Sequence, residues 1–364
     1  MTDILMFIED PGVANFMVPV IPALQGLGLH VALRVAGAAV EYIGQSSAVR
    51  AWTPEGDAAA VLDAVTPRLI FSGTSENMRS LGLDLIAAGR ARGLPTVAAV
   101  DAQSNAAARF RGLESAPLAF APDHILVPDD GTAQAYTALG HAQSEITVCG
   151  HPHYDSVLER LVELQDEGRD HVRARIIKAK AAGPVIVFAA EISTGLFPEQ
   201  YVRSSEYSLH GSGHFHGRTE VVIEEFLSAI ALMTPRPHTV LRLHPKNTRE
   251  ELAPFLDGFD EISQGGPGLD VVFAADAVCG MTSVLLAEAA VAGRPVLAIL
   301  PRRDERGWLP LLIQDQIAVA ETRTELEAAL GTLVAGARIL PVTIEAGAAE
   351  RAAAAIARIL QVNR

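Results

Sequence analysis

The chain has 364 residues, of which 49% are hydrophobic and 20% charged, and its formal net charge is −14 with a pI near 5.2. This apolar content is enough for real cores and excludes a mainly disordered chain. The negative field disfavours tight nucleic-acid binding through a broad basic face. At roughly 150 residues per domain, the length predicts two domains.

The cysteines and the apolar runs narrow the class of protein further. Cys149 and Cys279 lie far apart and form no CxxC pair, which argues against a disulfide scaffold or a zinc knuckle. No basic stretch precedes the first short apolar run, so we expect no signal peptide. No run of about 18 apolar residues is found, so we expect no transmembrane segment and a cytoplasmic location.

Short apolar runs alternate with amphipathic stretches, a pattern typical of βαβ units and a parallel sheet. In the first half this pattern predicts strands at 4–8, 30–35, 69–71, 96–100, 124–127 and 146–149. Helices are expected between them, and those over 77–92 and 131–139 end at Gly93 and Gly140, as glycine-terminated helices do. We assign 1–152 to an N-terminal Rossmann-like domain.

The second half repeats the pattern after a charged interruption. The stretch 153–182 is charged and helical without a strand signal, and we expect a helical connector. Strands are then predicted at 185–190, 238–243, 277–279, 295–300 and 317–319, which assigns 183–342 to a second Rossmann-like domain. The alanine-rich stretch 343–364 predicts a C-terminal helix that packs back on the junction. The polar, glycine- and histidine-rich stretch 192–220 is expected to be a functional loop.

Ligands of open parallel sheets bind at the carboxyl ends of the strands. The strongest candidate site follows the strand at 277–279, where Gly280, Met281, Thr282 and Ser283 lead into a helix that carries Glu288. Free amides, hydroxyl groups and the positive end of a helix suit a phosphate. A simple helix cap with a solvated glutamate is the alternative.

Three further segments of the same kind join this candidate nucleotide site. Lys246 follows the pair His244-Pro245, whose imidazole suits a base or a phosphate, although an ordinary strand-to-loop junction has the same sequence. Gly150 and His151 end the first half, where a structural turn is the alternative. The end of the strand at 185–190 adds Glu191 and Ser193.

The strand ends of the first half carry candidate acceptor-binding and catalytic groups. The candidates for acceptor binding are Glu9, Gly12, Asn15, Gly73, Thr74, Ser75, Arg109 and Arg218, the last from the loop of the second half. Asp10, Asp101 and Asp130 are candidate bases, because a carboxylate beside hydroxyl-binding groups suits removal of a proton. Tight turns with helix caps are the alternative for each.

Several familiar chemistries are not expected. His210, His214 and His216 lack acidic or cysteine ligands at a recognised spacing, so we expect no metal. A Gly-x-Gly-x-x-Gly turn after the first strand, a Walker loop and a nucleophile elbow are all missing, which disfavours dinucleotide enzymes, P-loop enzymes and α/β-hydrolases. We expect no resident cofactor.

Together these segments resemble the GT-B class, an α/β architecture of two Rossmann-like domains facing across a cleft. The resemblance rests on Cys149-Gly150-His151-Pro152, on His244-Pro245, and above all on 280–283 with Glu288 and Gly293-Arg294-Pro295. The pairs His244-Pro245 and Thr282-Ser283 are similar to motifs of bacterial sialyl- and Kdo-type transferases and CDP-glycerol glycerophosphotransferases, which contact a cytidine nucleotide and its phosphate. Asp129-Asp130-Gly131 looks like the acidic motif that supplies the base in the sialyltransferases.

The resemblance implies metal-independent glycosyl or related group transfer from a CMP-, CDP- or UDP-activated sugar to a hydroxylated acceptor. Thr282 and Ser283 would hold the phosphates, Glu288 the ribose, and His244 the base or a phosphate. His244 also counts as a catalytic candidate. The UDP-GlcNAc 2-epimerase type shares the fold and implies an epimerase or hydrolase as the alternative. A non-catalytic nucleotide-binding protein, and a monomer or a homodimer, both remain open.

Overall fold

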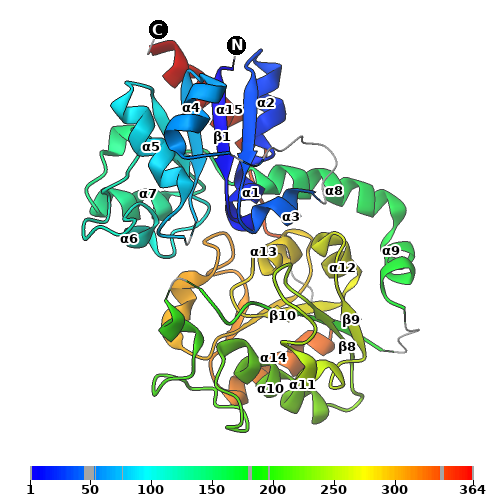
Figure 1. The fold of residues 1–364 in the computed structure, drawn as a ribbon. Coiled ribbons are helices and arrows are strands. Elements are labelled where there is room, and N and C mark those ends of the chain that lie inside the picture. Colours follow the sequence, from blue (N-terminus) through cyan, green and yellow to red (C-terminus); the bar gives the residue numbers. More distant parts are fainter. Residues whose placement is uncertain are drawn as a thin grey trace. The chain divides into compact units, whose positions relative to one another are not determined.

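The computed structural model describes residues 2–44, 53, 55–75, 77–178, 183–195, 197–336 and 340–362. The chain divides into two compact units, Met1–Leu158 with Glu345–Arg364, and Glu159–Ile344. The division falls within helix α8 (His153–Glu167), so the stretch expected as a connector is shared between the units. Figure 1 shows the elements of both units.

The first unit contains a parallel sheet of six strands in the order β2-β1-β3-β4-β5-β6. Its strands are β1 (Ile4–Ile8), β2 (Val31–Val35), β3 (Leu69–Gly73), β4 (Thr96–Ala99), β5 (His124–Val127) and β6 (Ile146–Val148). Its helices are α1 (Pro11–Met17), α2 (Val20–Gly26), α3 (Ala39–Gly44), α4 (Ala58–Val65), α5 (Leu81–Ala91), α6 (Ala106–Arg109), α7 (Asp130–Ala138), the 3-10 turn η1 (Gln143–Glu145) and α15 (Ala348–Val362).

Strand β1 shows why this sheet is covered on both faces. All five of its residues are buried, and alternate side chains point to opposite faces. Ile4, Met6 and Ile8 pack into a core with residues of α1, α2 and α15, whereas Leu5 and Phe7 pack with residues of α4 and α5. The C-terminal helix α15 is therefore part of the core of the first unit.

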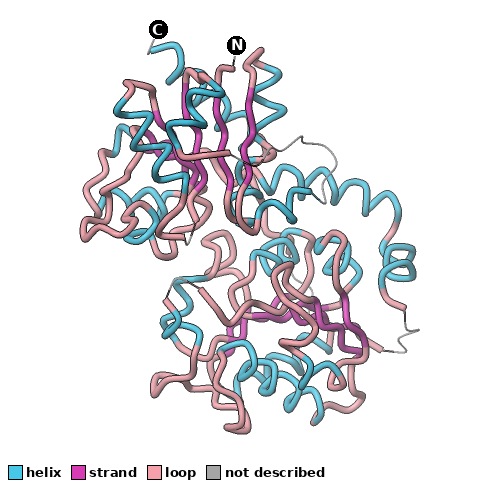
Figure 2. The backbone as a smooth tube through the Cα atoms, in the orientation of Figure 1, coloured by secondary structure: helices cyan, strands magenta, loops and turns pink. Residues whose placement is uncertain are grey.

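The second unit contains a parallel sheet in the order β12-β11-β10-β7-β8-β9. Its strands are β7 (Val185–Ala189), β8 (His238–Arg242), β9 (Glu261–Ser263), β10 (Ala277–Gly280), β11 (Val296–Ile299) and β12 (Ala318–Ala320). Its helices are α9 (Arg169–Ile176), η2 (Pro198–Tyr201), α10 (Arg218–Ala231), α11 (Ala253–Leu256), α12 (Gly268–Ala274), α13 (Val284–Val291), η3 (Arg303–Trp308) and α14 (Arg323–Val334). Figure 2 shows the strands of each unit gathered between helices.

The expectation of two Rossmann-like α/β units is confirmed, and each predicted strand is found with ends that differ by at most two residues. The helix expected over 77–92 starts later, at Leu81, because the Ser80 hydroxyl accepts a hydrogen bond from the Gly82 amide and caps it. Strand β9 was not predicted, since its three half-buried residues form no apolar run. Within the described ranges, no helix is long and apolar enough to cross a bilayer.

Candidate functional site

The strand order of the second sheet identifies where a ligand is expected. From β7 the chain proceeds to β8 and β9 on one side, and it returns on the other side of β7 with β10, β11 and β12. Parallel sheets bind ligands at the carboxyl end of such a reversal. Glu191 follows β7 and Thr282 follows β10, so both belong to this point of the sheet.

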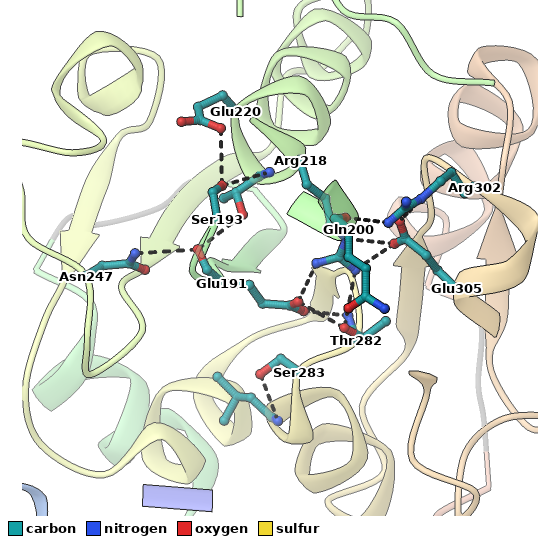
Figure 3. Close-up of polar contacts among 12 residues, drawn as sticks. Glu191, Ser193, Gln200, Arg218, Glu220, Asn247, Thr282, Ser283, Arg302 and Glu305 are labelled. Carbon is teal, nitrogen blue, oxygen red and sulfur yellow. Dashed lines mark hydrogen bonds and ion pairs between the residues drawn. The ribbon is translucent and has the colours of Figure 1, made fainter. Parts of the chain in front are cut away.

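Glu191 and Thr282 are in direct contact (Figure 3). One carboxylate oxygen of Glu191 accepts from the Thr282 amide at 2.5 Å, and the other accepts from the Thr282 hydroxyl at 3.0 Å. The Ser283 hydroxyl caps α13 by accepting from the Leu285 amide at 3.2 Å. Among the described residues no acceptor is found for the amides of Ser283 and Val284. A carboxylate thus occupies one donor of the predicted phosphate site, and two donors remain.

Arg218 holds Glu191 in this position. It is the first residue of α10, only 1% exposed, and it pairs with Glu191 at 2.8 Å and with Glu305 at 2.7 Å. Burial lowers the pKa of Arg218, but the two carboxylates outweigh burial and hold it above its usual value. Arg218 was expected to bind an acceptor, and the structure gives its buried guanidinium two carboxylate partners inside the second unit.

The sequence analysis missed Glu305 and Arg302. Both follow β11, and Arg302 donates to Glu305 at 2.8 Å and to the Gln200 carbonyl at 2.5 Å. The guanidinium groups of Arg218 and Arg302 lie 5.4 and 5.2 Å from the ring centre of Trp308. The rule that function follows strand ends applies to β11 as well, so it would have found this cluster.

The loop after β8 lies beside the same cluster. Asn247 accepts from the His244 amide at 3.1 Å and donates to the Glu191 carbonyl at 3.5 Å. The Lys246 amide donates to Nδ1 of His244 at 3.1 Å, so a neutral His244 ring carries its proton on Nε2. The structure therefore brings the predicted His244 segment and Glu191 together.

Three other predicted residues of the second unit, Glu288, Ser193 and Met281, are buried or bonded within that unit. Glu288 is 7% exposed, and its charge partly offsets the lowering of the Arg242 pKa by burial. Ser193 donates to Glu220 at 3.2 Å and accepts from the amide of Thr219. Met281 is fully buried, so only its backbone is available to a ligand.

The first sheet has an equivalent reversal between β1 and β3. Glu9, after β1, accepts from the Ser75 hydroxyl at 3.1 Å and from the Asn77 side chain at 2.7 Å, and the Ser80 hydroxyl also donates to it. Asp10 caps α1 by accepting from the Gly12 amide at 3.1 Å. The carboxylate of Glu9 is thus held by three donors at the reversal point.

Asp101 and Arg109 form a second polar group at the carboxyl ends of the strands of the first sheet. They pair at 2.9 Å, and Arg109 also donates to the Thr74 hydroxyl at 3.0 Å. A Cβ on Gly12 would lie 2.5 Å from the Asp101 carboxylate, so glycine allows this carboxylate to approach the start of α1. A Cβ on Gly73 would collide with Val13. The structure therefore gathers most of the predicted acceptor residues, while Asn15 accepts from the Tyr42 hydroxyl at 2.6 Å.

Three further predicted residues are Asp130, Gly150 and His151, all of which belong to the first unit. Asp130 is the exposed first residue of α7, and no hydrogen bond or ion pair joins it to Asp101 or Glu9 in the described part of the chain. Gly150 and His151 belong to the first unit, not to the unit of the predicted nucleotide residues.

Gly150 has a structural reason to be glycine. Its φ is +83°, and a Cβ there would lie 2.9 Å from the Arg351 guanidinium and 3.1 Å from the Ala348 Cβ. Residues of α15 thus occupy the space that a side chain at this position would enter. His151 lies against Phe16, with ring centres 5.2 Å apart, and desolvation with the neighbouring His153 charge lowers its pKa to about 3.

Within the described residues, no three His, Cys, Asp or Glu side chains are grouped closely enough to hold a metal ion. No model of a protein family matches the chain, and no curated protein matches it in sequence.

Solved structures share the fold over the whole chain. A UDP-GlcNAc 2-epimerase from Neisseria meningitidis bound to UDP-GlcNAc is 14% identical with a TM-score of 0.62, and 99% of this chain and 100% of that chain are covered. The enzyme from Methanocaldococcus jannaschii in complex with UDP-GlcNAc and UDP is 14% identical, with a TM-score of 0.66 and the same coverage. Anabaena HepE in complex with UDP-glucose is 12% identical, with a TM-score of 0.56 over 99% of this chain and 97% of that chain. At these identities the likeness establishes the fold.

Proposed function

We propose that the chain is an enzyme that acts on a UDP-activated sugar without an acceptor, as an epimerase or a hydrolase. The observation that carries this proposal is the polar cluster at the reversal of the second sheet, where the amides of Ser283 and Val284 start α13. A helix start of this kind favours phosphate. The solved structures with this fold add support, since their descriptions name UDP or UDP-sugars as ligands.

In this proposal the second unit binds the nucleotide. The diphosphate accepts from the amides at the start of α13, and Glu288 accepts from the ribose hydroxyls. A neutral His244 donates its Nε2 proton to a phosphate oxygen and stabilises the negative charge of a departing UDP. Acceptor-free turnover therefore takes the place of group transfer, which the resemblance of the sequence implied first.

The carboxylates of the first unit act on the sugar in the same proposal. Arg109 pairs with Asp101 and fixes the position of its carboxylate, the kind of group that serves as a general base. Asp10 caps α1 nearby and is the second candidate base. Asp130 is not retained, because it is exposed and unconnected to this group.

Group transfer to a hydroxylated acceptor is the second candidate. It is favoured by the hydrogen-bonding groups around Glu9, which accepts from Ser75, Asn77 and Ser80. In this candidate function the hydroxyl groups of an acceptor sugar bind to the same groups. The two candidates differ in one respect, because transfer consumes the nucleotide sugar only when an acceptor is present.

The first test is binding of UDP, CDP and CMP by isothermal titration calorimetry, with and without EDTA. We expect UDP to bind more tightly than either cytidine nucleotide and EDTA to have no effect.

UDP-GlcNAc is then followed by proton and phosphorus NMR without an acceptor, and we expect an epimerised UDP-sugar or free sugar with UDP. Asp101→Asn should keep UDP binding and lose turnover. Selective binding of a cytidine nucleotide would contradict the uridine assignment, and an unchanged UDP-GlcNAc sample would contradict acceptor-free turnover.

A further inference from the structure

A cavity of about 730 Å³ lies at the amino ends of the strands of the second sheet. Its lining includes Pro184, Asp276 and Pro295, which directly precede β7, β10 and β11. Since these strands are parallel, the cavity is at their amino ends and Glu191 and Thr282 are at their carboxyl ends. The cavity is therefore separate from the proposed nucleotide site.

Positive charge gathers at this cavity in a chain of net charge −14. Arg169 and Arg294 line it, and Arg173 lies one turn along α9 from Arg169. Asp276 is the only carboxylate among the described lining residues. It accepts from Arg169 at 2.5 Å, from Arg173 at 2.6 Å and from the Val185 amide at 2.8 Å. Three guanidinium groups thus face one carboxylate whose oxygens already have partners.

Two of these arginines have unused donors. The Nε of Arg169 is buried without a hydrogen-bond partner. Arg294 donates its Nε to the Ala292 carbonyl at 3.3 Å, and within the described residues its two terminal nitrogens have no acceptor. Burial, and then the charge of Arg169, lower the pKa of Arg294, and the charge of Asp276 offsets this lowering only in part.

We propose that this cavity is a second ligand site, which binds a small phosphate monoester carried on an apolar group. A phosphate dianion balances the two excess positive charges, and guanidinium groups bind phosphate through paired hydrogen bonds. The apolar part of the ligand lies against Leu333, Val334 and Leu340, which form the other wall.

The test uses phenyl phosphate, which combines a dianion with an apolar ring, titrated into the full-length protein by calorimetry. Inorganic phosphate and benzoate serve as comparison probes for the ring and for the charge. We expect saturable binding of one phenyl phosphate, at least about tenfold tighter than benzoate. The titration is run with and without excess UDP, and the same affinity is expected in both. Loss of binding in the presence of UDP would overturn the proposal, because the probe would then occupy the nucleotide site.

Variants at the cavity decide whether the binding is there. Arg294→Gln should weaken phenyl phosphate binding by about tenfold or more, and Arg294→Lys should restore part of it. Arg175→Gln, on α9, is the control, because Arg175 pairs with Glu167 at 2.9 Å and is not among the described residues that line the cavity. Equal binding by the wild type and Arg294→Gln would overturn the proposal.

A second pair of variants avoids any effect on folding. Leu340 is 90% exposed, so Leu340→Glu adds a negative charge at the cavity without disturbing a core, and Leu340→Gln is its neutral control. We expect weaker phenyl phosphate binding in Leu340→Glu than in Leu340→Gln, with unchanged UDP binding in both. Equal phenyl phosphate binding by these two variants would contradict the site.

Discussion

Glu191 occupies a position that a phosphate oxygen would also occupy. Its carboxylate accepts from the amide and the hydroxyl of Thr282, next to the start of α13. The ion pair with Arg218 holds Glu191 in this position. Removing the Glu191 carboxylate would leave the buried Arg218 guanidinium with one carboxylate partner instead of two. In the proposed nucleotide site, Glu191 would therefore compete with the phosphates for donors while it stabilises the fold.

This competition predicts opposite effects of one substitution. Glu191→Gln should strengthen UDP binding by about fivefold, because removal of a like charge near a phosphate is worth about 1 kcal/mol in a partly exposed site. The same change should lower the melting temperature, since Arg218 loses one of its two carboxylate partners. Calorimetric titration with UDP and thermal unfolding measure the two effects separately.

Glu305→Gln is the matched control. Glu305 pairs with Arg218 at 2.7 Å but makes no hydrogen bond to an amide of α13 among the described residues. It should lower the melting temperature without any gain in UDP affinity. Weaker UDP binding in Glu191→Gln would show that this carboxylate helps to hold the nucleotide.

His151 predicts a specific loss of stability in acid. Desolvation beside Phe16 and Tyr154 lowers its pKa to about 3 from the usual 6.5 of a histidine, so the native state keeps the ring neutral. As the pH falls below 6.5, His151 is protonated in the unfolded chain, whereas in the native chain it is protonated only near pH 3. The stabilisation is complete above that window and declines within it by at most about 1.4 kcal/mol per pH unit.

Urea unfolding at pH 7.5 and pH 5 tests this dependence. His151→Gln removes the titrating group, so the stability difference between wild type and variant should shift by about 2 kcal/mol against the wild type on going to pH 5. His171→Gln, at an exposed position of α9, is the control. A stability difference that is the same at both pH values would mean that His151 titrates normally in the native state.

At the scale of elements, α13 has one residue with two possible roles. The Ser283 hydroxyl caps the helix, and the Ser283 amide is one of the donors that we assign to phosphate. Ser283→Ala should destabilise the protein by about 1 kcal/mol through loss of the cap. Ser283→Asp should retain the cap and the stability, but its charge should weaken UDP binding by about tenfold or more.

The comparison of these two variants separates capping from ligand binding. Thermal unfolding reports the cap, and calorimetric titration with UDP reports the phosphate site. Unchanged UDP affinity in Ser283→Asp would show that the diphosphate does not lie at the start of α13.

The elements also show which sequence signals are strong. Buried strands such as β1 and β7 were predicted almost residue by residue, because each is a continuous apolar run between polar turns. Strand β9 has no such run, and its place at the edge of the sheet follows from pairing with β8 alone. A short edge strand of this kind forms through hydrogen bonds to the neighbouring strand, so its own residues carry no sequence pattern that predicts it.

At the scale of the whole molecule, strand order decided how much of the site could be predicted. The strand-end rule identified Glu9, Asp101, Glu191 and Thr282, which the structure places at the reversal points of the two sheets or on the strand next to them. It could not identify the role of Gly150, because α15 reaches Gly150 from the far end of the chain. Contacts between residues distant in sequence leave no local pattern.

The return of α15 to the first unit makes a prediction about the stability of the two units. Ile356 of α15 is fully buried in the core of the first unit, and Leu330 of α14 is fully buried in the core of the second. Replacement of either side chain by alanine should cost about 2–5 kcal/mol in the unit that contains it. UDP should stabilise only the second unit, because a ligand stabilises the structure that binds it.

Differential scanning calorimetry with and without UDP tests this assignment. Ile356→Ala should lower the melting transition that UDP leaves unchanged, and Leu330→Ala should lower the transition that UDP raises. Each variant is the control for the other, because both remove a buried aliphatic side chain from a helix. If Ile356→Ala lowered the UDP-sensitive transition instead, α15 would stabilise the second unit, and the division of the chain would have to be redrawn.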